Sequence, residues 1–344
     1  STSDRPNIVL FFTDQQRWDT CGCYGSGMDI TPNLDRLAAR GVRFEKAFTC
    51  QPVCGPARAS LQTGRYAADT GCWRNAIPLP TDERTIAHHF NEAGYRTGYV
   101  GKWHLAKTGA DPIPVERRGG WQHWIAAEVL EYTSHPESGY LWDADNNKVE
   151  FEGKARSDFL TDLSIDFIDS CGDEPFVLMT SYIEPHQQND EDRLHAAFDA
   201  AKDYQNPWVP HDLRNLPGDW QKELPDYYAM IARLDANLGR LLDHLDRRGL
   251  TEKTIFVFTS DHGCHFRTRN SEYKRSCHDA CTHIPMVLAG PGLDRSAVVP
   301  ELVSLVDLPP TLLAAAGLDV PETMHGRSLL DLLDRRAEDW PEEV

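Results

Sequence analysis

The stretch Asn7-Ile8-Val9-Leu10-Phe11-Phe12-Thr13 is a continuous apolar run that lies between Pro6 and Asp14. Such a run is typical of a strand that is buried on both faces of a parallel sheet. Asp14-Gln15-Gln16 would then stand at the carboxyl end of this strand, the edge at which open α/β sheets bind their ligands. Asp14 is therefore a candidate metal ligand, with an ordinary turn aspartate as the alternative.

Strand and helix patterns alternate along the rest of the chain. Further strands are expected at 42–48, 95–100, 176–182, 254–259 and 285–289. Helices are expected at 31–40, from residue 54 onward, and at 85–93, 157–168, 226–248 and 306–316. This alternation predicts an α/β fold with a mostly parallel central sheet and helices on both faces. We expect a single domain over residues 1–344, with loop-rich excursions at 111–153 and 187–225.

Composition limits the partners of this chain. Its 344 residues include 53 acidic and 35 basic side chains, a formal net charge of −18. This charge argues against general binding to nucleic acid or to an anionic membrane, so an anionic substrate needs a local positive site. No run approaches the ~18 consecutive apolar residues of a membrane span. The stretch from Ser1 to Pro6 lacks the regions of a signal peptide, which was either removed or never present. The location is therefore left open, with a periplasmic or secreted one favoured over a cytoplasmic one.

The nine cysteines are an odd number. If Cys54 is set aside, the other eight could pair in an oxidising compartment or stay as buried thiols. Short spacing among Cys277, His278, Cys281 and His283 also allows a zinc site, although a loop that lines a pocket is the favoured interpretation.

Cys54-Gly55-Pro56-Ala57-Arg58 opens a short apolar run that ends at Thr63-Gly64-Arg65. Pro56 suits the first turn of a helix. The free backbone N–H groups and the positive dipole end of that helix would favour an anion beside residue 54, and would favour the thiolate of an unmodified cysteine. Cys54 is therefore a candidate nucleophile, with a buried structural cysteine as the alternative.

Three of the other expected strands are also followed by titratable side chains. These side chains are Lys102 and His104 after 95–100, His186 after 176–182, and Asp261 and His262 after 254–259. Because parallel strands end at the same edge of a sheet, together they predict a metal site beside a group of cations.

With these motifs in place, the chain resembles the type I, formylglycine-dependent sulfatases of the alkaline phosphatase superfamily. The resemblance covers nearly the whole chain in order. Its motifs are the strand Pro-Asn-Ile-Val-Leu with Asp14, Cys54-x-Pro-x-Arg58 with Leu-x-Thr-Gly-Arg65, Gly-Lys102-Trp-His104, Pro-His186, and Ser-Asp261-His262-Gly. The resemblance implies an alkaline-phosphatase-like fold and a sulfuric ester hydrolase activity. It also implies that a formylglycine-generating enzyme oxidises Cys54 to formylglycine, whose hydrate is the nucleophile.

The resemblance further implies a role for each site residue. Asp14, Gln15, Asp261, His262 and the modified Cys54 would hold one divalent cation, with Ca²⁺ favoured and Mn²⁺ or Mg²⁺ also accepted. The other roles are stabilisation of the hydrate by Arg58 and Lys102, reopening of the aldehyde by His104 as a base, assistance to the leaving group by His186 and Lys274, and substrate binding by Asn75 and His265.

Two positions depart from the pattern of many sulfatases. Gln15 and His262 stand where many members carry an aspartate and an asparagine. Related phosphonate monoester and phosphodiester hydrolases share such residues, and they share a lysine at the offset of Lys274 from Asp261. Those hydrolases are therefore the alternative function, while Lys102 and His104 favour a sulfatase. An inactive homologue that binds sulfated glycans is an alternative of another class.

The substrate and the end of the chain give two further expectations. The segment 121–142 is rich in Trp and Tyr, which suggests a carbohydrate substrate because sugar rings stack on aromatic faces. Sulfatases usually continue beyond the region of Gly326 into a small antiparallel subdomain. Since this sequence stops at Val344, we expect that subdomain to be missing or truncated.

Overall fold

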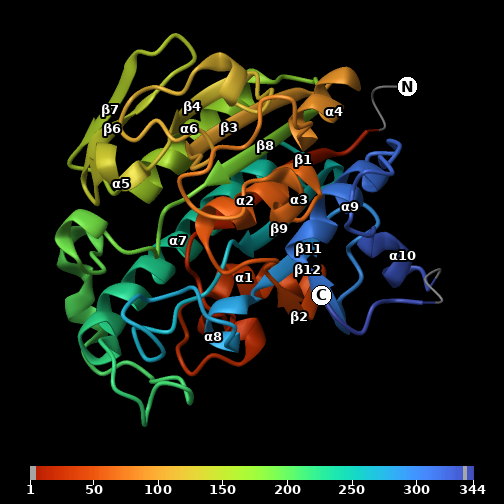
Figure 1. The fold of residues 1–344 in the computed structure, drawn as a ribbon. Helices are drawn as coiled ribbons and strands as arrows, with labels where there is room; N and C mark the ends of the chain where they lie inside the picture. The colour runs from red at the N-terminus through yellow and green to blue at the C-terminus, as the bar shows by residue number, and fades with distance from the viewer. Residues whose placement is uncertain (1–4, 336–338) are drawn as a thin grey trace.

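The computed structural model describes residues 5–335 and 339–344, and all strands in these residues belong to one sheet (Figure 1). In sheet order the strands are β10 (His283–Ile284), β2 (Val42–Phe48), β11 (Met286–Ala289), β9 (Thr254–Ser260), β1 (Asn7–Thr13), β8 (Phe176–Ser181), β3 (Arg96–Lys102), β4 (His123–Ala127), β6 (Ser138–Trp142) and β5 (Ser134–His135), while β12 (Ala297–Ser304) pairs with β2 and β7 (Lys148–Glu152) with β6.

The centre of the sheet is parallel, as the sequence predicts. Strands β9, β1, β8, β3 and β4 run in the same direction, and every residue of β1 is buried. Ile8 lies opposite Val177 on one side and Ile255 on the other. The margins are mixed, because β11 runs against β9 and β2 and β6 runs against β4, whereas β12 runs parallel to β2.

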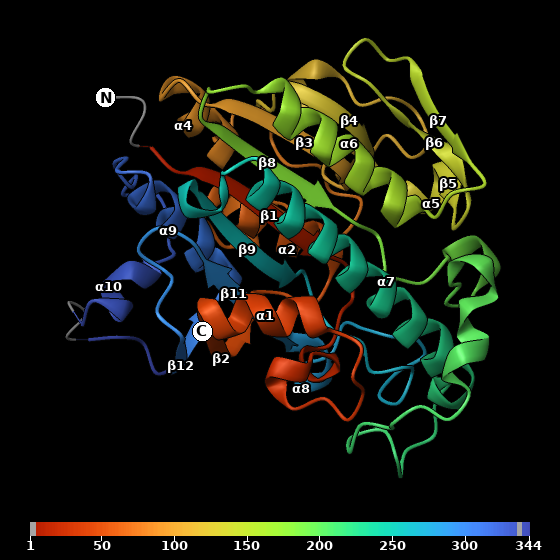
Figure 2. The same ribbon diagram turned by 180° about the vertical axis from the view of Figure 1, so that it is seen from behind.

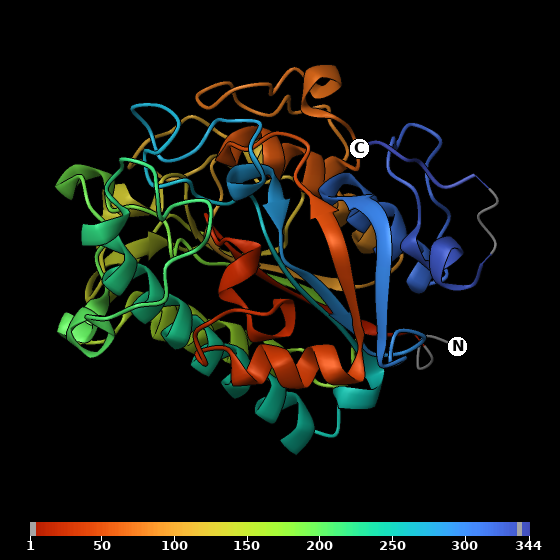
Figure 3. The same cartoon turned by 90° about the horizontal axis from the view of Figure 1, so that it is seen from below.

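Helices cover both faces of the sheet. Ile8, Leu10 and Phe12 of β1 pack under one layer, and Val9 and Phe11 pack under the other, because successive side chains of a strand point to opposite faces. The first layer contains α2 (Cys54–Thr63), α4 (Ile86–Glu92) and α9 (Leu308–Ala315), and the second contains α1 (Pro32–Arg40), α6 (Arg156–Ser170) and α7 (Trp220–Arg247). Figure 2 shows the second layer, and Figure 3 shows β2 and β12 side by side between the two layers.

The segment 111–153 has more regular structure than the sequence predicts. It contains β4, α5 (Leu130–Thr133) and the ribbon of β5, β6 and β7, which extends the sheet at one margin. The ribbon lacks a long apolar run because most of its residues are at least partly exposed. Tyr140 and Trp142 lie against the ammonium group of Lys148, so these aromatic side chains anchor the ribbon.

The segment 187–225 is mostly irregular, as the sequence predicts, but a helix begins before its expected end. It contains 3₁₀ turns at Asn189–Glu191 and Ala197–Tyr204, and then α7 begins at Trp220, six residues before the expected start. The sequence pattern treats Pro225 as a boundary, whereas the helix continues through it. Glu223 ties the first turns of α7 to the excursion, because its carboxylate accepts a hydrogen bond from the backbone N–H of Leu194 at 2.6 Å.

The last described elements are α9 and α10 (Leu329–Leu333), and no second sheet follows them within residues 5–335 and 339–344. Short helices α3 (Ala67–Thr70) and α8 (Asp279–Thr282) lie in loops. None of the helices in the described part of the chain is both long and apolar enough to cross a membrane. All nine cysteines are unpaired thiols.

Candidate active site

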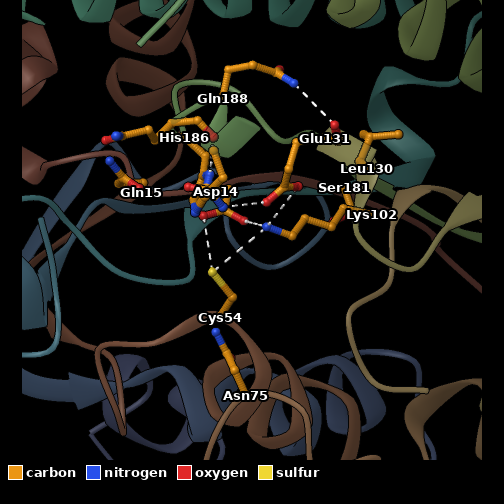
Figure 4. Close-up of polar contacts among 12 residues, drawn as sticks. Asp14, Gln15, Cys54, Asn75, Lys102, Leu130, Glu131, Ser181, His186 and Gln188 are labelled. Atoms are coloured by element: carbon orange, nitrogen blue, oxygen red, sulfur yellow. Dashed lines mark hydrogen bonds and ion pairs between the residues drawn. The ribbon is translucent and has the colours of Figure 1, made fainter. Parts of the chain in front are cut away.

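The carboxyl ends of the parallel strands bring the predicted side chains together around Cys54. Asp14 follows β1, His186 follows β8 by way of a short turn, Lys102 is the last residue of β3, and Asp261 follows β9. Cys54 is the first residue of α2 and is fully buried. Figure 4 shows Asp14, Lys102, His186 and Glu131 on one side of Cys54 and Asn75 on the other.

Four polar groups surround the sulfur atom of Cys54. The Lys274 Nζ lies 2.9 Å from the Sγ, the His262 Nε2 3.2 Å, the Asp14 Oδ1 3.5 Å and the Lys102 Nζ 3.9 Å. Lys274, which no regular element carries, thus reaches the same atom as side chains from the sheet. Both ammonium groups are buried, so their positive charge acts on residue 54 with little screening by water.

This environment favours negative charge at residue 54. Burial raises the pKa of the Cys54 thiol, but the charges of Lys102, Lys274 and His262 and a hydrogen bond from His104 overcome it and hold that pKa well below its usual range. The site can therefore stabilise an oxyanion or a bound sulfate group at this position just as it stabilises a thiolate.

The residues predicted to bind a cation form a compact group. Ligand atoms of Asp14, Cys54, Asp261 and His262 all lie within 4.8 Å of one another, and no other such group of His, Cys, Asp or Glu exists among the described residues. The zinc interpretation of the segment that contains Cys277 therefore has no support. His262 Nδ1 donates to the carbonyl of Gly263 at 2.8 Å, which leaves Nε2 free to face the group.

Two buried oxygens of the predicted metal ligands lack hydrogen bonds, which leaves them available to a cation. They are Oε1 of Gln15 and Oδ2 of Asp261, and the second lies 3.5 Å from the Nη2 of Arg58. Burial and the charge of Asp14 raise the pKa of Asp261 to about 7. Two buried carboxylates repel each other in this way unless a cation lies between them. With an imidazole nitrogen and an amide oxygen beside them, these donors fit one divalent cation.

Arg58 connects the metal group to the sheet. Its Nη2 donates to Asp14 Oδ2 at 2.9 Å, and its Nη1 donates to the hydroxyl of Ser181 at 2.7 Å and to the carbonyl of Lys102 at 3.0 Å. Burial opposes ionisation of Asp14, yet Lys102, His186 and Arg58 hold the pKa of this carboxyl well below its usual range. Arg58 thus keeps Asp14 charged and fixes its position.

Replacing Arg58 by alanine is expected to lower the free energy of unfolding by about 3 kcal/mol, because it leaves a buried carboxylate short of its partner. Urea unfolding of the metal-free protein measures this change. Arg84→Ala is the matched control, since Arg84 forms an ion pair with Glu92 on the surface and its loss should change the free energy of unfolding far less. Equal losses in the two variants would contradict the structural role of Arg58.

Glu131 joins this site although no sequence pattern identifies it. Its side chain is buried, its Oε2 lies 3.9 Å from the Lys102 Nζ, and its Oε1 accepts a hydrogen bond from Asn189 at 3.0 Å. The residue belongs to the short helix α5 inside the excursion, so only the folded chain places it beside Lys102. Its charge helps to keep that lysine protonated, because Asp14, Cys54 and Glu131 together raise the pKa of Lys102 against the effect of burial.

His186 and Lys274 form a pair of potential donors next to Cys54. The Lys274 Nζ lies 3.1 Å from the His186 Nε2, and both side chains are buried. The His186 Nδ1 donates to the carbonyl of Gln187 at 2.7 Å, which orients the ring. Both donors lie beside Cys54, where they could give a hydrogen bond or a proton to a group bound there.

The remaining predicted residues lie at the site in different ways. His104 has a left-handed backbone conformation (φ 62°), and its side chain forms a hydrogen bond with Cys54. The Asn75 Oδ1 accepts a hydrogen bond from the backbone N–H of Gly55 at 2.8 Å, which secures the first turn of α2. His265 is fully buried, and its Nε2 bonds to the carbonyl of Lys274 at 3.2 Å. His265 therefore helps to position the loop that carries Lys274, and its contact with a substrate stays a prediction.

Comparison with known proteins agrees with this geometry. The family model described as "Sulfatase" matches residues 6–318. The ulvan-active sulfatase of Formosa agariphila is 32% identical over 96% of this chain and 65% of its own length. The N-acetylglucosamine-6-O-sulfatase of Bacteroides thetaiotaomicron is 26% identical over 98% of this chain and 73% of its own length.

One solved structure bears on the alternative function. The phosphonate monoester hydrolase of Silicibacter pomeroyi superposes with a TM-score of 0.75 and 24% identity, over 98% of this chain and 78% of that chain. At this level of identity the likeness shows a shared fold. The chain thus spans about two thirds to four fifths of the length of these three proteins.

Proposed function

Because the chain belongs to the sulfatase family, we propose that it hydrolyses a sulfate ester with a formylglycine hydrate that is formed from Cys54. The observation that carries this proposal is the surrounding of the Cys54 sulfur by two buried lysines and a group of metal-binding side chains. The cations supply the positive charge that a sulfate group needs, in a protein whose net charge is −18.

The hydrate accounts for both halves of the reaction. One of its hydroxyl oxygens attacks the sulfur of the ester, and the bond between sulfur and the alcohol oxygen breaks. The alcohol leaves with a proton. Loss of the proton from the second hydroxyl then breaks the bond between the hydrate carbon and the sulfated oxygen, so that sulfate is released and the aldehyde forms again. Water restores the hydrate. The original cysteine has no second hydroxyl for this release.

The residues around Cys54 support these steps by position and charge. Lys102 and Arg58 hold Asp14 charged and in place, and His104 is the base that takes the proton of the second hydroxyl. Lys274 and His186 lie where one of them can give a proton to the departing alcohol. A divalent cation held by Asp14, Gln15, Asp261 and His262 would supply Lewis-acid stabilisation of the developing charge.

A sulfated carbohydrate is the substrate that we propose. One relative is named as an N-acetylglucosamine-6-O-sulfatase, which acts on a sulfated sugar. Tyr140 and Trp142, part of the aromatic segment noted in the sequence, pack within their own ribbon. Trp73 and Tyr132 are exposed aromatic side chains, and these faces are accessible to a sugar ring.

The alternative function is hydrolysis of a phosphonate monoester or phosphodiester, which the shared fold of the Silicibacter enzyme and the residues Gln15, His262 and Lys274 favour. Parallel assays with an aryl sulfate and an aryl phosphodiester test it. We expect kcat/KM for the sulfate to be larger by about tenfold or more. A preference for the phosphodiester would reverse the assignment. Binding of sulfated glycans without turnover of either ester would indicate an inactive homologue.

A further inference from the structure

A cleft with a volume of about 440 Å³ lies next to Cys54 and is not used by the mechanism above. Its walls include Val53, Trp73, Arg74, Asn75 and Arg275. Val53 precedes Cys54 in the chain. Gly55, which follows Cys54, donates a backbone hydrogen bond to the Asn75 side chain. The cleft therefore begins within one residue of the nucleophile.

Asn75, one wall of the cleft, lies on the side of Cys54 that faces away from the metal group. Figure 4 shows the Asn75 side chain pointing toward Cys54 from that side, with Asp14 and His186 opposite. Arg275 follows Lys274, so the loop that delivers a lysine to the sulfur also forms a wall of the cleft. A substrate with its sulfate at Cys54 would thus place a neighbouring group in the cleft.

An aromatic ring provides one surface of the cleft. Trp73 is 51% exposed, which is unusual for so large an apolar side chain. The Gln51 Nε2 donates a hydrogen bond to the backbone carbonyl of Trp73 at 2.7 Å. The Arg74 guanidinium lies 5.0 Å from the centre of the Trp73 ring. Together they present a flat apolar face with a positive charge on it, which suits a sugar ring that carries an anionic group.

The positive charges of the cleft are available to a ligand. In the part of the chain that the structure describes, Arg74 forms no ion pair, and its side chain is exposed. Arg275 pairs with Glu272 at 3.0 Å, but both side chains are about half exposed, so this pair is weak and can exchange. Two accessible guanidinium groups beside one nucleophile are notable in an acidic protein, and they would attract a carboxylate or a sulfate.

We propose that this cleft is a subsite for an anionic sugar residue that adjoins the sulfated one. The ring of that residue lies on Trp73, and its carboxylate or second sulfate group binds Arg74 and Arg275. The subsite rests on the proposed sulfatase function, and it narrows the substrate class to saccharides with an acidic residue next to the cleavage site.

The test compares three substrates: a sulfated disaccharide with a uronate neighbour, the same disaccharide with a neutral neighbour, and an aryl sulfate. For Arg74→Ala we expect the ratio of kcat/KM for the anionic disaccharide to that for the neutral one to fall about tenfold, because a charge-assisted hydrogen bond is lost. Arg74→Lys should keep part of the ratio. Trp73→Ala should lower kcat/KM for both disaccharides relative to the aryl sulfate.

Arg36→Ala is the matched control, since Arg36 is an exposed residue of α1 on the other layer and its loss changes the net charge equally. Its ratio should equal that of the unaltered protein. A ratio that Arg74→Ala leaves unchanged, or that Arg36→Ala lowers as much, would overturn the subsite. A disaccharide with a second sulfate in place of the uronate tells which anion the cleft prefers, and the proposal requires Arg74→Ala to weaken at least one of the two.

The subsite and the proposed function can fail separately. If the unaltered protein hydrolyses none of the three sulfate esters, the proposed function fails. Equilibrium binding of the desulfated uronate disaccharide then tests the cleft alone, with Arg74→Ala and Arg36→Ala as before. Weaker binding in the first variant and unchanged binding in the second would support the cleft, and equal binding in both would exclude it.

Discussion

Replacing Cys54 by alanine is expected to lower kcat/KM for an aryl sulfate by about 10⁴-fold or more, as for the loss of a nucleophile that acts in both halves of a reaction. Alanine removes the sulfur atom that Lys274, His262 and Asp14 all contact. Initial rates with the purified variant measure the loss. Cys171→Ala, which removes a free thiol at the end of α6 in the other helix layer, is the matched control and should keep most of the activity.

Serine at residue 54 sharpens this prediction. A serine hydroxyl can attack the ester once, but it offers no second hydroxyl to release the sulfate. We therefore expect Cys54→Ser, if it reacts, to accumulate a sulfated serine and to stop after one turnover. Mass spectrometry of the intact protein detects the added sulfate. Continuous turnover by this variant would contradict the mechanism.

The chemical form of residue 54 can be read from one tryptic peptide. Cleavage after Lys46 and Arg58 gives residues 47–58, which contain Cys50 as well as Cys54. Cys50 serves as an internal reference, because it should stay a thiol that reacts with iodoacetamide. Conversion of Cys54 to formylglycine exchanges sulfur and two hydrogens for one oxygen and removes this reactivity. Two alkylated cysteines, in active protein made with a competent formylglycine-generating enzyme, would exclude the modification.

Those parts of the fold that depend on long apolar runs could be predicted from the sequence. Strands β1, β8 and β9 were recognisable because burial on both faces requires a run of apolar residues. β3 is less apolar, and its place in the alternation of strands and helices identified it. Their parallel direction then places the residues that follow them at one edge. This reasoning found Asp14, Lys102, His186 and Asp261, and the structure brings all four together around Cys54.

Other parts depend on tertiary contacts that leave no local pattern. β12 pairs with β2 through a bulge between Val299 and Leu302, where Pro300 and Glu301 interrupt the apolar run. Glu131 reaches Lys102 from a helix of four residues, too short for a hydrophobic period. Trp73 lies on a loop, and only the folded chain shows that its side chain is exposed and lines the same cleft as Val53 and Asn75.

Removal of the divalent cation is the second change for which we expect a large effect. Asp14 and Asp261 are fully buried, and the charge of Asp14 contributes to the high pKa of Asp261. Without a cation the site therefore contains two repelling carboxylates, and with one it contains a neutralised group. Exhaustive chelation should lower kcat/KM by about 100-fold or more, because the Lewis-acid contribution is lost, and it should also lower the melting temperature.

The same experiment distinguishes binding from catalysis. Ca²⁺ returned to the chelated protein should raise the melting temperature with increasing concentration, since a ligand that binds only the folded state stabilises it. Asp261→Asn keeps the shape of the side chain but removes its charge. The same increase in melting temperature should therefore require a much higher Ca²⁺ concentration. Asp243→Asn, an exposed residue that pairs with Arg36, should respond as the unaltered protein does.

Titration with Mg²⁺ and Mn²⁺ tests which ion the donors select. An amide oxygen, an imidazole and two carboxylates form a less anionic set than three carboxylates, so Mn²⁺ should restore activity along with Ca²⁺. Mg²⁺ should restore less, because it gives up its water ligands reluctantly. Full activity after chelation, in protein shown by elemental analysis to hold no metal, would exclude a cation from the mechanism and leave Lys102, Lys274 and Arg58 as the source of positive charge.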